Sequence, residues 1–231
     1  MGISLVSLQL TAAQANGICL AQAVAAAGSL ALNGALVAAG IATMDIARRV
    51  SIASTGADGA LVFTVVGTNR SGAPIQENVT GVSVAGGAKA TMQDYLTVTR
   101  VVSSGASAGN ITVGTNTTAS TEWQLDNPFV PDFSLSLFVT APNDGVTTYT
   151  VEVTPDDPNV GTASNQPSIE PNSFSPPQAW PDPVLAAQTQ SGMSGWNRPI
   201  MAHRLTITAG TGKCTMQSMQ TEWGVGNYNA R

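Results

Sequence analysis

Charged side chains are scarce in this sequence. Only 10% of its 231 residues are Asp, Glu, Lys or Arg, whereas about 25% is usual for soluble proteins. Small uncharged residues, chiefly alanine, glycine, serine, threonine and asparagine, take their place. Because a monomer with so few charges has little protection against self-association, the composition favours a protein whose surface is covered by neighbours in an assembly. A compact extracellular β protein with a Thr/Ser-rich surface is the alternative.

Basic residues are too few and too scattered to bind a nucleic acid. The chain has nine Lys and Arg residues and a net charge of −5, and its one adjacent basic pair is Arg48-Arg49. Recognition of nucleic acids requires a basic patch that neutralises phosphates. We therefore exclude nucleic acid as a partner.

Long apolar runs are also missing. The apolar stretch from residue 18 to residue 46 is broken by Gly28, Asn33-Gly34 and Gly40, whereas a membrane-spanning helix needs about 20 uninterrupted apolar residues. The chain starts Met-Gly-Ile-Ser-Leu, without the basic residues with which a signal peptide begins. We expect no membrane partner and a protein that is assembled in a bacterial cytoplasm.

Residues that carry catalysis or hold metals are rare. The single histidine, His203, has no nucleophile-elbow glycine pattern to accompany it, and we expect it at the surface or at an interface. Cys19 and Cys214 lack the CxxC spacing of metal ligands. A disulfide between them stays open, but isolated thiols usually serve as small apolar residues. We therefore predict no catalytic residues, no metal and no cofactor, and the chain is not expected to be an enzyme.

Carboxylates are scattered along the chain rather than paired. Two of them could act as the acid and the nucleophile of a glycosidase, and Asp156-Asp157-Pro158 could offer oxygen ligands to calcium. The spacing of an EF-hand is absent, and Asp before Pro is typical of an ordinary turn. We predict neither activity. The carboxylates considered are Asp94, Glu122, Asp126, Asp132, Asp144, Glu152, Asp156, Asp157 and Glu222.

Alternation of apolar and polar residues dominates what is present, and it predicts an all-β protein. Asn33-Gly34 is typical of a type I′ hairpin turn, and residues 133–139 with 148–154 are predicted to form a second hairpin. Little helix is expected beyond residues 11–15 or 183–190. The predicted strands cover 4–10, 18–22, 29–37, 50–53, 61–65, 75–82, 95–102, 111–113, 133–139, 148–154, 200–208 and 214–223.

A sequence pattern that occurs twice indicates two domains. An ITxGT pattern precedes Thr-Glu-Trp in residues 111–123 and again in residues 207–223. Repetition of this kind is typical of duplicated units. We predict two antiparallel β-sandwich or barrel-like domains, residues 1–125 and 126–231, which are related to each other.

Proline is concentrated in residues 155–199, which hold nine of the chain's 13 prolines. A long segment without periodicity is usually functional or a linker, and proline favours extended backbone. We predict an extended arm that lies along another surface, with a loosely held loop as the alternative. The candidate interface residues are Trp180, Trp196, Trp223, Arg48 and Arg49.

The middle of the chain resembles virion structural proteins of tailed bacteriophages. The resemblance is carried by Ala42–Ser54 (ATMDIARRVSIAS), Phe63–Asn69 (FTVVGTN), Glu77–Gly81 (ENVTG) and Tyr95–Thr115, with the Asn33-Gly34 turn before them. It covers residues 15–155 well and the closing strands loosely. The Pro-rich segment has no counterpart.

The resemblance implies a non-enzymatic particle protein of the head surface, neck or tail, with no catalytic residues to transfer. The favoured role is a capsid decoration or cement protein that forms homo-oligomers, such as trimers, and binds the major capsid protein in the virion. A neck or tail component, such as a head-to-tail fibre or tail-associated protein, is the alternative. A module that binds host carbohydrate through exposed tryptophans is a third hypothesis.

Overall fold

The computed structural model describes residues 2–130, 132–156, 158 and 179–221. It confirms the predicted fold class, because the chain is all-β with antiparallel sheets that are not closed into a barrel. The helices expected in residues 11–15 and 183–190 are wrong, since both segments form turns and irregular loops. Neither has an apolar stripe of helical period that packing could bury.

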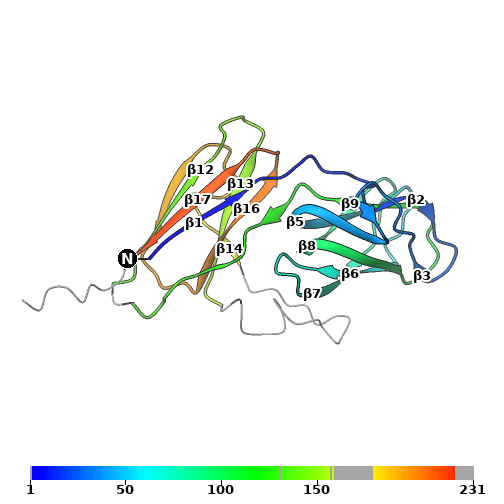
Figure 1. Cartoon of the computed structure of the whole chain (residues 1–231), viewed down its shortest axis with the longest axis horizontal. Helices are drawn as coiled ribbons and strands as arrows, with labels where there is room; N and C mark the ends of the chain where they lie inside the picture. Colours follow the sequence, from blue (N-terminus) through cyan, green and yellow to red (C-terminus); the bar gives the residue numbers. More distant parts are fainter. Residues whose placement is uncertain (1, 131, 157, 159–178, 222–231) are drawn as a thin grey trace, which may run out of the picture. The chain divides into compact units, whose positions relative to one another are not determined.

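The chain divides into two compact units (Figure 1). Of the described residues, unit 2 contains 11–119, whereas unit 1 contains those before residue 11 and those from 120 onward. This grouping differs from the predicted division at residue 125. Residues 2–8 pair with 214–220, and residues 124–125 pair with 202–203, so both segments belong with the later part of the chain.

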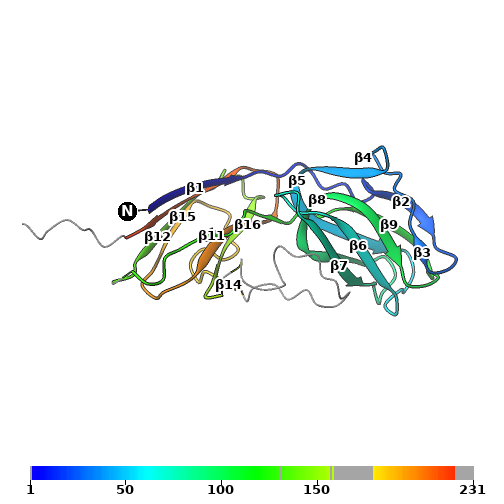
Figure 2. The ribbon, with the colours of Figure 1, turned by 60° about the horizontal axis from the view of Figure 1, so that its bottom comes forward.

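Unit 2 is built on one eight-stranded sheet with the order β2-β9-β5-β8-β6-β7, to which β3 and β4 add short pairings. Register shifts interrupt the pairing of the long strands β5 and β8, and such bulges bend a ladder. Six of the strands can therefore line a single core (Figure 2). The strands are β2 (Cys19–Ala23), β3 (Gly28–Ser29), β4 (Val37–Ala38), β5 (Ile41–Ser54), β6 (Val62–Thr68), β7 (Pro74–Thr80), β8 (Ala88–Ser103) and β9 (Asn110–Thr115).

Unit 1 contains two sheets. Sheet A has four strands in the order β1-β17-β12-β15, and sheet C has the order β10-β16-β13-β14, with β11 paired to β16. Alternate residues of both sheets are fully buried, for example Leu137 in sheet A and Val151 in sheet C, as in a β-sandwich. The strands are β1 (Gly2–Leu8), β10 (Ala119–Ser120), β11 (Gln124–Leu125), β12 (Leu135–Thr140), β13 (Thr148–Thr154), β14 (Trp180–Pro181), β15 (Gly192–Trp196), β16 (Ala202–Ala209) and β17 (Cys214–Gln220).

Both predicted hairpins are wrong. The N–H groups of Asn33 and Gly34 donate to the carbonyl of Ile18, and a Cβ on Gly34 would lie 2.3 Å from the backbone of Gly17. The Asn-Gly turn is therefore packed against the preceding segment and does not join two paired strands. The strands β12 and β13 are connected by the predicted turn at residues 142–145, but they belong to different sheets.

The two copies of the repeated sequence pattern do not form equivalent strands at the ends of the two units. The N–H of Thr121, in the first Thr-Glu-Trp, donates to the carbonyl of Leu205 at 2.8 Å. The first copy of this motif therefore pairs with the strand that carries the second ITxGT pattern, inside unit 1. The two units also differ in topology, with one sheet in unit 2 and two in unit 1.

The Pro-rich segment is described only in part, because residues 157 and 159–178 lie outside the described residues. The remainder does not form a separate arm. Residues 180–181 form β14 at the edge of sheet C, and residues 192–196 form β15 at the edge of sheet A. This part of the predicted arm is built into the sandwich of unit 1.

Candidate functional site

The outer surface of sheet A is an uncharged face on which large apolar side chains lie among serine, threonine and glutamine. Cross-strand neighbours share a face of a sheet, and one row runs Leu5, Gln217, Phe138, Met193 across all four strands. Leu5 is 67% exposed and Met193 is 63% exposed. We call this surface the sheet A face. Its members are Ile3, Leu5, Ser7, Thr215, Gln217, Met219, Ser136, Phe138, Thr140, Met193 and Gly195.

An exposed phenylalanine lies near one end of this sheet. Phe129 is 87% exposed, and its N–H donates to the side chain of Asn127 at 3.1 Å. The side chain of Gln220, the last residue of β17, accepts from the N–H of Asn127 and donates to its carbonyl. These paired bonds hold the turn, and so an exposed aromatic ring is presented from an ordered backbone rather than from an unattached loop.

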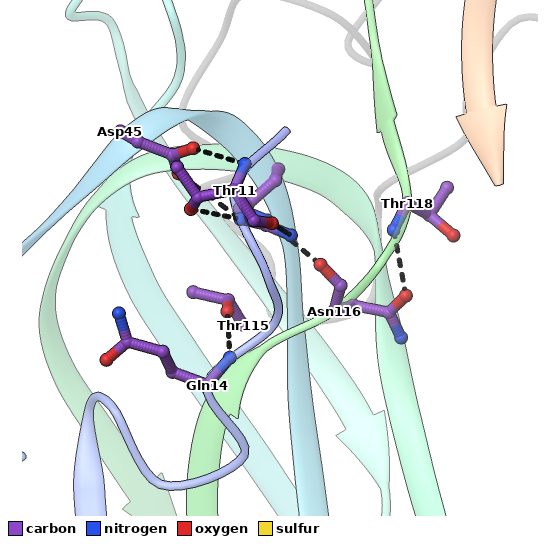
Figure 3. A network of polar contacts seen from close by, with 7 residues as sticks. Thr11, Gln14, Asp45, Thr115, Asn116 and Thr118 are labelled. Atoms are coloured by element: carbon purple, nitrogen blue, oxygen red, sulfur yellow. Dashed lines mark hydrogen bonds and ion pairs between the residues drawn. The ribbon is translucent and has the colours of Figure 1, made fainter. Parts of the chain in front are cut away.

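Arg48, one of the predicted interface residues, is a buried residue of unit 2. It is 1% exposed, and this corrects the expectation that it faces a partner. Its guanidinium donates to the carbonyls of Asn116 and Thr11 at 2.9 and 3.1 Å and to Asp45 at 3.2 Å (Figure 3). A buried arginine needs such saturation of its donors. Arg48 therefore acts as an internal tie within unit 2.

Arg48 holds the first and the last described segment of unit 2 to its sheet. The N–H of Gln14 donates to the hydroxyl of Thr115, and the N–H of Thr115 donates to the carbonyl of Gln14. The N–H of Thr118 donates to the side chain of Asn116 (Figure 3). Residues 11–14 and 115–118 are thereby fixed to the sheet, next to the points at residues 10/11 and 119/120 where the chain passes to unit 1.

Arg49 is partly buried rather than displayed. Its Nε atom is buried without a hydrogen-bond partner among the described residues. The nearby carboxylate of Glu77 accepts from the N–H groups of Met92 and Gln93 in a bulge of β8. Burial raises the pKa of Glu77, although those two N–H groups and the charge of Arg49 act in the opposite direction. Arg49 thus supports a buried carboxylate and is not part of a basic patch.

The predicted tryptophans differ in their surroundings. Trp180 in β14 is 44% exposed, so it remains available to a partner. Trp196 in β15 is half-buried, and its indole N–H donates to the carboxylate of Asp182. Trp223 lies outside the described residues. Of the two predicted tryptophans that the structure describes, only Trp180 has its ring largely free for a partner.

Asp182, which sequence reasoning did not select, organises this edge of unit 1. It is fully buried. One of its oxygens accepts from the N–H groups of Val184 and Leu185, and the other accepts from Ser194 and Trp196. It thus joins the β14 segment of sheet C to β15 of sheet A. A buried carboxylate with four donors is well satisfied, which is typical of a structural role.

The single histidine is in the core of unit 1, contrary to the expected surface position. His203 is 2% exposed, and its Nδ1 atom lies 2.8 Å from Oδ2 of the buried Asp126. Its Nε2 atom has no hydrogen-bond partner among the described residues. An Asp–His pair can activate a nucleophile, but no hydroxyl or thiol of the described chain bonds to this histidine.

The remaining candidate groups are dispersed. Cys19 and Cys214 are buried and free, and burial raises the pKa of their thiols to about 12 and about 11. Glu152 forms an ion pair with Arg204 at 2.7 Å, and Arg204 also lies 4.4 Å from the ring centre of Trp123. Within the described ranges, no three His, Cys, Asp or Glu residues are grouped as metal ligands.

Comparison with known proteins finds no family model, no curated protein and no solved structure that matches the chain. In the part of the chain that the structure describes, no helix has the length and apolar character to cross a membrane.

Proposed function

We propose that this chain is a non-enzymatic structural component of a tailed-phage particle and that it decorates the capsid surface. The observation that carries the proposal is the sheet A face, which crosses four strands without a charged side chain. Exposed apolar side chains such as Ile3, Leu5 and Met193, when they lie together on one face, mark sites of protein association. The resemblance of residues 42–115 to virion structural proteins supplies the particle context.

The polar networks support a structural role. Arg48, Asp182 and the Asp126–His203 pair are each buried and each hold backbone segments or strands together. Buried hydrogen-bonded networks such as those of Arg48 and Asp182 rigidify a fold. A decoration protein gains from rigidity because weak contacts then act together in a symmetric array.

The neck or tail position is the alternative within the same class, and copy number separates the two. The carbohydrate-binding hypothesis receives less support. Trp196 uses its indole N–H within the protein, and Trp180 is one partly exposed ring rather than a row of stacking surfaces. We therefore retain the capsid position as the proposal.

Particle incorporation of a tagged chain tests the proposal. Met193→Glu places a charge on the sheet A face, and Val84→Glu places the same charge on unit 2 at a valine that is 73% exposed. We expect both variants to fold, Val84→Glu to co-purify with particles, and Met193→Glu to be depleted from them. Equal incorporation of Met193→Glu would contradict the role of this face, and absence of the unmodified chain from particles would contradict the proposed function.

A further inference from the structure

The strand β1 is an open edge of sheet A (Figure 2). It pairs along its whole length with β17, from Gly2↔Gln220 to Leu8↔Cys214, without a register shift. Among the described residues, no other backbone hydrogen bond involves residues 2–8. Within the described part of the chain, the side of β1 that faces away from β17 therefore presents a row of unpaired N–H and C=O groups.

This edge lacks the devices with which proteins usually prevent edge pairing, namely charge, proline, bulges and short length. β1 is seven residues long, Gly-Ile-Ser-Leu-Val-Ser-Leu, with no charge and no proline. By contrast, β7 starts with proline and carries a glutamate, β2 has a register shift, and β14 is two residues long with a proline. β15, at the other edge of sheet A, is uncharged but shorter and has a glycine inside the strand, which weakens it.

We propose that β1 pairs antiparallel with β1 of a second copy of this chain about a two-fold axis at Leu5. The inference rests on the proposed structural role and names one partner for it. Leu5 is the midpoint of the strand, and a two-fold axis there is the register that pairs all residues from 2 to 8. Leu5 then faces Leu5 of the second copy, and Ile3 faces Ser7.

This register also continues the sheet A face. Ile3 and Leu5 are 61% and 67% exposed on the outer side of β1. A pairing shifted by one residue would bring the outer side chains of one copy beside the inner side chains of the other. The two-fold register instead places Ile3 and Leu5 of both copies together on one uncharged surface. No like charges meet, since β1 has none.

Cysteine cross-linking of the purified full chain tests this register without particles. Directly opposite residues have Cβ atoms about 4.5–5.5 Å apart, close to the separation in a disulfide. The native Cys19 and Cys214 are buried with raised thiol pKa values, so they give little background. We expect Leu5→Cys to form a disulfide dimer with itself, and Ile3→Cys to react with Ser7→Cys in a mixture but poorly with itself.

Two further variants make the outcome decisive. Met193→Cys is equally exposed but lies on the opposite edge of sheet A, and it should cross-link little. Leu5→Lys should stay folded and weaken dimerisation at least about tenfold, since like charges would face each other. The inference is overturned if Leu5→Cys stays monomeric, if Ile3→Cys prefers itself, or if Met193→Cys reacts as well. A monomeric chain that still binds particles would leave the proposed function intact.

Discussion

The Nε–H of Arg48 in β5 donates a hydrogen bond of 2.9 Å to the carbonyl oxygen of Asn116, which lies 68 residues further along the chain. Together with the bond to the carbonyl of Thr11, it fastens both segments that connect unit 2 to unit 1 along the sequence. An arginine fits this position because its planar fork can serve several acceptors at once. The residue thus stabilises the fold of unit 2 and offers no contact to a partner.

Replacing Arg48 with methionine should destabilise unit 2 by about 2–3 kcal/mol, because buried carbonyls of Thr11 and Asn116 lose their donor. Arg48→Lys should recover only part of this loss. Amide hydrogen exchange is the measurement, and exchange should accelerate at residues 14, 115 and 118. Unchanged protection at these amides would refute the role of Arg48 as a tie.

The Asp45–Arg48 ion pair should make the free energy of unfolding depend on pH in the acidic range. Burial alone would raise the pKa of Asp45, but bonds from Thr11 and the charge of Arg48 outweigh it and lower the pKa below its ordinary value of 3.8. A lowered pKa in the folded state stabilises the protein above the ordinary value, and this gain is lost as pH falls through the folded value. Urea unfolding should show Asp45→Asn less stable at neutral pH, with a difference from the native chain that narrows below pH 3.8. A constant difference would argue against the ion pair.

The backbone of residues 14–15 lies so close to Gly114 that a larger side chain there should destabilise the fold. A Cβ there would lie 1.9 Å from the carbonyl oxygen of Gln14, whereas a Cβ on Gly28 would meet nothing within 4 Å. Gly114→Ala must therefore displace residues 14–15 and should cost about 2–3 kcal/mol. Gly28→Ala is the matched control and should change the free energy of unfolding by less than about 1 kcal/mol. Equal effects of the two changes would show that residues 14–15 do not lie on β9.

Trp196→Phe removes one donor from the buried carboxylate of Asp182 and keeps most of the ring. We expect a loss of about 1–2 kcal/mol from thermal or urea unfolding, and a larger loss for Asp182→Ala, about 3 kcal/mol, which frees two backbone N–H groups. In the double variant the losses should not add, because both act on one network. Additive losses would contradict this arrangement.

The Asp126–His203 pair is predicted to serve stability. Asp126→Ala leaves the ring nitrogens of the buried His203 without a partner and should cost about 2–3 kcal/mol of unfolding free energy. Cross-linking of Leu5→Cys should be unaffected at temperatures where this variant is folded. A loss of self-association without a loss of stability would assign the pair to an interface instead.

The alternation of apolar and polar residues predicted most strands, because a strand with one buried face and one exposed face has this pattern. The same alternation indicates the buried positions of two residues that were expected to be exposed. Arg48 has the parity of the buried Val50 and Ile52, and His203 has the parity of Leu205 and Ile207. A polar side chain suggests exposure, but strand parity outweighs side-chain type where the fold supplies a partner, as Asp126 does for His203.

Other features depended on long-range pairing and could not be predicted from local pattern. A turn signal at residues 142–145 gives a change of direction, but it does not decide whether the next strand stays in the same sheet. The sheet A face collects single residues from four separated strands. In β1 itself, apolar residues fall on both sides, Leu5 outward and Val6 inward, so periodicity left its faces undetermined.

The copy number of the chain in purified particles tests the central claim most directly. Quantitative mass spectrometry should find it in an amount comparable with that of the major capsid protein, as a symmetric decoration requires. About a dozen copies or fewer would indicate a neck or tail component instead. Absence of the chain from particles that are otherwise complete would contradict the proposal that it is a structural component of the virion.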